Sequence, residues 1–157
     1  MRTHRLRLPD ESATLALGAA LWPGLPVTGC VYLSGDLGAG KTTLVRGLLR
    51  AAGHKGAVRS PTYTLIEPYT LAGRQLFHLD LYRLGDPEEL EFIGLRKLLG
   101  QGVLLVEWPA QGYGVLPPPD WVIELAADGP ARQATFTVSN GAMQLAEVIE
   151  QLSETLS

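Results

Sequence analysis

Residues 35–42, Gly35-Asp36-Leu37-Gly38-Ala39-Gly40-Lys41-Thr42, are the stretch that decides the fold of this 157-residue chain. They follow the phosphate-binding pattern Gly-x-x-x-x-Gly-Lys-Thr, known as Walker A. The apolar run Cys30-Val31-Tyr32-Leu33 before them is typical of a strand buried in a parallel sheet. After them, apolar side chains recur at helical spacing, at Leu44, Val45, Leu48 and Leu49. A strand, a glycine-rich turn and a helix in this order predict a P-loop.

The residue types in this stretch have physical reasons to bind a phosphate. Glycines let successive backbone N–H groups turn inward around phosphate oxygens without a Cβ clash. The helix that follows adds the partial positive charge of its N-terminus. Lys41 can reach the β- and γ-phosphates, and the Thr42 hydroxyl can ligate Mg²⁺. We therefore expect a site for a nucleotide and its magnesium ion.

Length and composition limit the remaining possibilities. A chain of 157 residues fits one domain, and 46% hydrophobic with 18% charged residues is a globular composition. A net charge of −3 argues against a strongly electrostatic binder of nucleic acid or membranes. No apolar run approaches the ~20 residues of a membrane helix. The single cysteine, Cys30, suits a reducing compartment and a buried position. We expect one cytoplasmic domain spanning residues 1–157.

The hydrophobic pattern predicts an α/β fold with a mixed sheet flanked by helices. Strands are expected at 4–8, 30–33, 103–106, 121–125 and 134–138, with a hairpin of strand-like runs at 62–69 and 75–82. Asp10 can cap a helix that runs to Trp22, and Asp86 is expected to start another helix. A last helix carries an apolar stripe that includes Val148, Ile149 and Leu152.

Two carboxylates end apolar strands and are the candidates for metal and water chemistry. Asp80 ends the run 76–79, which is the Walker B pattern, and such an aspartate holds the metal directly or through water. Leu81 follows it, where many ATPases carry a glutamate, so another residue must orient the attacking water. Glu107 ends the run 103–106 and is the best candidate, because ligands bind beyond the carboxyl ends of such strands. The structural alternative for Asp80 is an ordinary turn residue at the end of a strand. The structural alternative for Glu107 is a surface carboxylate with a salt-bridge partner.

For four other residues near these strands, a functional role and a purely structural role both remain open. Thr62 lies in Ser60-Pro61-Thr62-Tyr63-Thr64, where GTPase-like proteins keep a switch loop, although ordinary turn chemistry explains the segment equally well. His78 on an apolar strand favours a structural hydrogen bond over a catalytic role. Trp108 favours packing that orients its loop, and Arg83 a salt bridge or partner contact over an arginine finger.

In this order the motifs resemble the TsaE family, small bacterial ATPases of tRNA threonylcarbamoyladenosine biosynthesis. The resemblance spans nearly the whole chain and rests on Asp10-Glu11 with Thr14, 35–43, 60–65, 78–83 and Glu107-Trp108-Pro109. It implies ATP or ADP with Mg²⁺ as ligands and the TsaD–TsaB pair as partner. The net charge of −3 predicts that tRNA is met through those partners, without membrane or direct DNA binding. We also expect slow hydrolysis by the isolated chain, because the sequence shows no Walker B glutamate and no clear arginine finger.

The resemblance also assigns roles to residues. It implies that Lys41, Thr62, Asp80 and Glu107 serve catalysis, and that Thr42, Asp80 and Glu107 serve the metal. It leaves open which carboxylate touches magnesium, although spacing favours Asp80. The nucleotide would meet ten residues: Glu11 near the purine, Asp36, Leu37, Gly38, Ala39, Gly40, Lys41, Thr42, Thr43, and Arg132 at the outer edge. Ala110 departs from the polar residue that often follows Glu-Trp-Pro, which concerns a partner contact.

Two alternatives from other classes remain. A small-molecule kinase usually carries a lid with several arginines, and no arginine cluster follows Asp80. A GTP-binding switch would need an Asn-Lys-x-Asp motif to read guanine, and the sequence has none.

Overall fold

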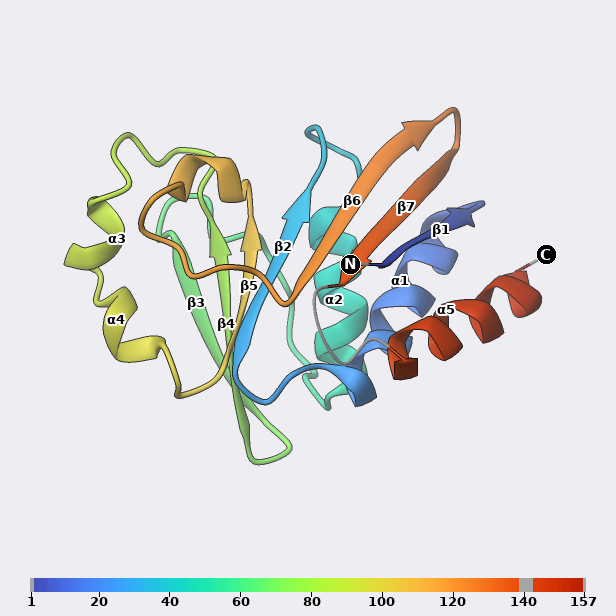
Figure 1. Ribbon diagram of the computed structural model, residues 1–157, viewed down its shortest axis with the longest axis horizontal. Coiled ribbons are helices and arrows are strands. Elements are labelled where there is room, and N and C mark those ends of the chain that lie inside the picture. Colours follow the sequence, from blue (N-terminus) through green and yellow to red (C-terminus); the bar gives the residue numbers. More distant parts are fainter. Residues whose placement is uncertain (1, 139–142, 157) are drawn as a thin grey trace.

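One mixed sheet of seven strands organises the chain, in the order β1-β7-β6-β2-β5-β4-β3. The computed structural model describes residues 2–138 and 143–156 (Figure 1). The strands are β1 (Arg2–Leu8), β2 (Gly29–Ser34), β3 (Ile66–Leu71), β4 (Arg74–Asp80), β5 (Val103–Glu107), β6 (Trp121–Asp128) and β7 (Ala131–Val138). The pairs β6–β2, β2–β5 and β5–β4 are parallel, whereas β1–β7, β7–β6 and β4–β3 are antiparallel.

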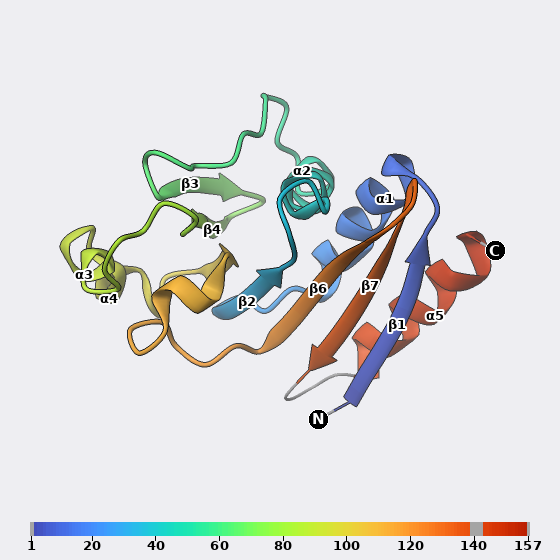
Figure 2. The same cartoon turned by 90° about the horizontal axis from the view of Figure 1, so that it is seen from above.

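Helices cover both faces of this sheet (Figure 2). One face carries α1 (Glu11–Leu21), α2 (Lys41–Ala51) and α5 (Met143–Leu156), and the other carries the short helices α3 (Glu89–Phe92) and α4 (Leu95–Leu98). Short 3₁₀ turns follow α1 at Trp22–Gly24 and β5 at Pro109–Gly112. The expected mixed α/β sheet flanked by helices is confirmed.

The interior strand β5 shows why the core lies on both faces of the sheet. All five of its residues are buried. Val103 and Leu105 belong to the cluster beneath α1 and α2, whereas Leu104 and Val106 belong to the cluster beneath α3 and α4. Successive side chains of a strand point to opposite faces, so a strand covered on both faces reads as a continuous apolar run.

Most of the expected elements are present with small shifts of their ends. Asp10 caps α1, because its Oδ1 accepts a hydrogen bond of 2.8 Å from the Ala13 N–H. The hairpin β3–β4 turns at Ala72 and Gly73, both with positive φ. The last helix buries Ile149, and Leu152 packs against the same core.

Three expectations about element ends were wrong. The strand expected at 62–69 begins only at Ile66, because Leu65 has a φ of 68° and its N–H closes a turn onto the Pro61 carbonyl. Its partner strand ends at Asp80 instead of residue 82. Asp86 does not cap a helix directly, since the cap residue of α3 is Glu88. Asp86 instead accepts from the Glu88 N–H at 2.9 Å, which forms a turn before the helix.

The described residues, 2–138 and 143–156, include no helix that is long and apolar enough to cross a membrane.

Two glycines let α1 lie directly against α2. A Cβ on Gly18 would lie 2.1 Å from the Leu44 carbonyl oxygen, and a Cβ on Gly47 would lie 2.2 Å from the Leu15 carbonyl oxygen. Both neighbours are helix backbone, which cannot move aside without separating the helices. The contact keeps the N-terminus of α1 beside the loop that precedes α2.

Gly47→Ala should therefore destabilise the fold. Overpacking of this kind costs roughly 1–3 kcal/mol, which at about 2–4 °C per kcal/mol lowers Tm by roughly 3–10 °C. Gly24→Ala is the matched control, since nothing lies within 4 Å of its Cβ position. Thermal unfolding by circular dichroism compares the two, and an unchanged Tm for Gly47→Ala would contradict the close packing.

Cys30 is fully buried on the α3–α4 side, as expected for a small apolar side chain. Burial, helped by the Asp120 carboxylate, raises the pKa of its thiol to about 12. The thiolate is the reactive form, so we expect no reaction of the native chain with a thiol reagent at pH 8. One thiol per chain should react once the protein is unfolded in guanidinium. Prompt labelling of the native chain would contradict this burial.

Candidate functional site

The loop 35–40 joins β2 to α2 and contains a turn in which the Ala39 N–H donates to the Asp36 carbonyl at 3.1 Å. Gly40 precedes the first residue of α2 and has a φ of 107°, which L side chains rarely adopt. Its conformation lets the helix begin directly at Lys41. The N-terminus of α2 therefore opens into the space beyond the carboxyl end of β2, where an anion meets backbone N–H groups and the helix dipole.

Lys41 lies almost fully buried beneath Trp108. Its Nζ donates to the Gly35 carbonyl, lies 3.5 Å from the Asp36 carbonyl oxygen, and sits 3.6 Å from the centre of the Trp108 ring. Burial lowers the pKa of the ammonium group, and the carboxylates of Glu107, Asp80 and Asp36 partly counteract this. The lysine is thus a cation that faces acidic groups and the open space above the loop.

Asp80 and Glu107 lie side by side because their strands are in register. They are partners in the parallel pair β4–β5 and are 4% and 3% exposed. Neighbouring strands lie about 4.8 Å apart, so two carboxylates at the same edge share one small space. The buried ends of both predicted strands therefore meet next to the P-loop.

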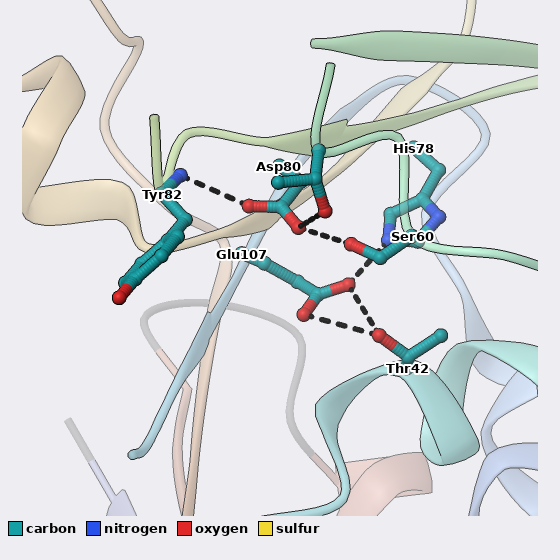
Figure 3. A network of polar contacts seen from close by, with 7 residues as sticks. Thr42, Ser60, His78, Asp80, Tyr82 and Glu107 are labelled. Atoms are coloured by element: carbon teal, nitrogen blue, oxygen red, sulfur yellow. Dashed lines mark hydrogen bonds and ion pairs between the residues drawn. The ribbon is translucent and has the colours of Figure 1, made fainter. Parts of the chain in front are cut away.

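The Glu107 carboxylate connects strand β4 to helix α2. The Thr42 hydroxyl donates to it, with Oγ1 3.1 Å from Oε2 and 3.4 Å from Oε1. On the other side, His78 Nε2 lies 2.6 Å from Oε2. Figure 3 shows the three side chains as one chain of contacts. Glu107 is therefore the carboxylate in contact with the P-loop threonine.

The Asp80 carboxylate holds the loop 60–62 in place. Its Oδ2 accepts from the Ser60 hydroxyl and, at 3.2 Å, from the Thr62 hydroxyl, while its Oδ1 accepts from the Tyr82 N–H at 2.9 Å (Figure 3). Thr62, expected as a switch residue, thus reaches the acidic pair. Ser60 was not predicted as a site residue. Its hydroxyl, two positions before that of Thr62, could have indicated a second hydrogen-bond donor to the acidic pair.

A cavity of about 390 Å³ lies in front of these groups. Its walls come from the P-loop and the start of α2, the loop 60–62, and the residues at and beyond the ends of β4 and β5: Leu37, Gly38, Gly40, Lys41, Thr42, Thr43, Ser60, Thr62, Asp80, Tyr82, Arg83, Glu107 and Trp108. Trp108 packs against Tyr82 with ring centres 5.0 Å apart, and Arg83 stacks on Tyr63 at 4.6 Å. All four residues predicted to be catalytic face this one space.

A second cavity, of about 340 Å³, lies on the other side of the P-loop. It shares Gly38, Gly40 and Thr43 with the first cavity and is also lined by α1 and the β6–β7 turn, through Asp10, Glu11, Thr14, Pro130 and Arg132. The two cavities therefore meet along the loop. An elongated ligand whose anionic end occupies the first cavity can place its other end in the second.

Arg132 binds the back of the P-loop. Its Nη2 donates to the Gly38 carbonyl at 3.0 Å, and its Nε donates to the Ala39 carbonyl at 3.1 Å. Residue 132 thus supports the loop's shape as well as lining the cavity. Glu11, the other resemblance-based residue, lies across the same cavity with its Oε1 3.8 Å from Arg46.

Two of the predicted nucleotide residues, Asp36 and Ala39, are not among the residues that line the two cavities. The Asp36 side chain is exposed, and Asp36 contributes its carbonyl to the loop. Ala39 is buried, and its carbonyl is the acceptor for Arg132. Leu37 is 66% exposed at the rim of the first cavity. These residues belong to the loop through their backbone.

The donor set fits magnesium. Across residues 2–138 and 143–156, no group of three or more His, Cys, Asp or Glu side chains is arranged to hold a metal ion. Mg²⁺ is usually held by one or two carboxylates together with phosphates and water. Thr42, Asp80 and Glu107 offer such a set of hard oxygen donors beside the loop 35–40.

Comparison with known proteins agrees with this geometry. The family described as threonylcarbamoyl adenosine biosynthesis protein TsaE matches residues 8–134. The chain belongs to the TsaE family. The matched residues include the P-loop, the loop 60–62, both strand-end carboxylates and Arg132.

Individual TsaE relatives differ in how much of the chain they align with. A Haemophilus influenzae protein named tRNA threonylcarbamoyladenosine biosynthesis protein TsaE is 55% identical over 96 residues, 60% of this chain and 61% of its own length. A protein of the same name from Bacillus subtilis is 38% identical over 92% of this chain and 89% of its own. The crystal structure of Bacillus subtilis YdiB superposes with a TM-score of 0.74 at 29% identity, covering 99% of this chain and 97% of that one.

Replacing Arg132 should loosen the P-loop. Arg132→Ala removes two hydrogen bonds to loop carbonyls, and a loss of about 1 kcal/mol in local stability corresponds to a factor of about five. We expect hydrogen exchange of the amides in 38–42 to accelerate roughly fivefold or more. Arg7→Ala is the control, because Arg7 makes an exposed ion pair with Asp128 at 3.8 Å. Equal amide exchange rates of 38–42 in the two variants would contradict the role of Arg132 in supporting the loop.

Proposed function

We propose that the chain is a Mg²⁺-dependent ATPase subunit that acts with the TsaD–TsaB pair in tRNA threonylcarbamoyladenosine modification. The observation that carries the proposal is the contact between Thr42 and Glu107, with Asp80 beside them. A P-loop hydroxyl and two strand-end carboxylates at one cavity are what nucleotide hydrolysis with a metal ion requires.

The nucleotide's phosphates would lie on the N–H groups of the P-loop, with Lys41 as their counter-charge. The lysine is suited to this task, because it stands at the start of α2, lies under Trp108 and lines the first cavity. The base would occupy the second cavity, near Glu11 and Arg132. Both ADP and ATP extend from one cavity to the other in this arrangement.

Thr42 and Glu107 would hold the magnesium ion. Sequence spacing favoured Asp80 as the direct ligand, but the contacts favour Glu107, which is hydrogen-bonded to Thr42. Asp80 accepts hydrogen bonds from Ser60 and Thr62 and would order that loop and hold water beside the metal. Bound Mg²⁺ supplies positive charge that stabilises the transferring phosphoryl group.

The partner assignment rests on the family. A net charge of −3 makes tight binding of a phosphate backbone by this chain alone unfavourable, so tRNA would be met through TsaD–TsaB in the cytoplasm. Tyr63 is 82% exposed beside the first cavity and carries Arg83 on its ring. Such an exposed aromatic and arginine pair is suited to a protein contact that adjusts the site.

Glu107→Ala should abolish partner-stimulated ATP hydrolysis. We expect slow turnover of the isolated wild-type chain with Mg²⁺, a strong increase on adding TsaD–TsaB, and a loss of roughly 10²-fold or more in the variant, because one preorganised charged group contributes this much. Steady-state phosphate release measures the rates. Glu67→Ala, which removes an exposed carboxylate on β3, is the control.

The same assay separates the alternatives. ATP bound without stimulation, together with phosphate transfer to an added metabolite, would replace the proposal by a kinase. Preference for GTP over ATP in competition would replace it by a guanine-nucleotide switch. Unchanged turnover of Glu107→Ala would remove Glu107 from the chemistry.

A further inference from the structure

His78 is a buried polar residue that the proposed function has not yet used. It is 0% exposed, on the same face of β4 as Asp80, and its Nε2 lies 2.6 Å from Glu107 Oε2. From this contact we infer that His78 is a positioning residue, which fixes the Glu107 carboxylate for the metal. The inference rests on the proposed function, since it assigns the residue that makes Glu107 effective.

The hydrogen bond has one consistent direction. A carboxylate only accepts, so the ring donates its Nε2–H to Glu107. Within the described residues, the buried Nδ1 has no hydrogen-bond partner. A buried N–H without an acceptor is costly, so a proton at Nε2 and none at Nδ1 is the arrangement with the lower cost. The His78 ring therefore makes one hydrogen bond as a donor, from Nε2–H to the Glu107 carboxylate.

Glu107 needs such a donor because its other contact is shared. The Thr42 hydroxyl reaches both carboxylate oxygens, at 3.1 and 3.4 Å, and is also the proposed metal ligand. A hydroxyl whose oxygen faces a metal has its O–H direction set by the metal. His78 keeps its bond in either case, since it stands on a strand paired on both sides, with Glu67 and Leu105 as its register partners.

Without His78 the carboxylate would lose its fixed plane but keep its charge. Hydrogen-bond partners of ligating groups typically matter by about 10–100-fold. We expect a fall of that size in kcat and little change in nucleotide affinity, because the P-loop and Arg132 bind the rest of the nucleotide. A residue that only fills the core would instead lower Tm and leave kcat per folded molecule unchanged.

The test combines four variants of the full chain. His78→Gln can place an amide N–H near the Nε2 position, whereas His78→Asn is too short and His78→Phe has no donor. Leu76→Val is the control for lost packing on the same strand and face. With Mg²⁺, ATP and the TsaD–TsaB pair, kcat should fall about 10–100-fold for Phe and Asn and stay within about threefold for Gln and the control. ADP affinity of all four should stay within about threefold of wild type.

A double variant and a spectroscopic readout that does not depend on turnover complete the test. In the Glu107→Ala background, His78→Phe should cause no additional loss of kcat, as expected for residues that act as a unit. Nitrogen-15 spectra of the histidine rings should show one slowly exchanging Nε2–H that His78→Gln removes. Glu107→Ala should shift it, and Glu67→Ala should leave it in place.

The outcomes separate the two claims. A wild-type chain without turnover would remove the proposed function and, with it, this inference. Wild-type turnover with unchanged kcat in the folded Phe or Asn variants would overturn the inference alone. If His78→Phe does not fold, the comparison of Asn with Gln decides, and equal rates for those two would overturn the inference as well.

Discussion

The register of the parallel pair β4–β5 is the constraint on which the site depends. It places Asp80 opposite Glu107 at the same edge of the sheet, next to the start of α2. A slip of one residue would turn either side chain to the opposite face, towards α3 and α4. The register is held by the apolar side chains of both strands, which are packed from both faces. The core thus sets the distance between two groups that would otherwise repel each other.

Burying this much charge requires each group to have partners. Asp80 receives three hydrogen bonds, Glu107 is bonded to Thr42 and His78, and Lys41 rests on backbone carbonyls and an indole ring. Removing one partner from such a network costs more than its presence contributes, because the remaining charge is left buried. The site therefore constrains the loop 60–62 and the turn after β5 as strictly as it constrains the carboxylates.

The sequence predicted the parts whose local pattern is strong. The Walker A motif predicted the unit of β2, the P-loop and α2. The apolar runs at 76–79 and 103–106 predicted where the two acidic residues lie near that loop. It could not predict which carboxylate contacts Thr42. The strand ends indicate only that both carboxylates lie near the start of α2, whereas side-chain packing decides which of them bonds to the hydroxyl. His78 was expected to make a structural hydrogen bond, and the structure identifies its acceptor as Glu107. Ser60 and the backbone role of Arg132 depend on loop geometry, which residue spacing does not encode.

The antiparallel part of the sheet explains why the fold extends beyond a minimal P-loop unit. Strand β7 returns beside β6 and brings Arg132 to the carbonyls of Gly38 and Ala39, while β1 leads directly into α1 and the second cavity. The carbonyls of Gly35, Gly38 and Ala39 accept hydrogen bonds from side chains, because backbone acceptors need donors. Arg132 supplies the donors for Gly38 and Ala39 from an element 93 residues away from Ala39. The loop 35–40 is thereby shaped from the antiparallel end of the sheet, on the far side of β2 from the carboxylates, which makes both halves of the chain necessary for one site.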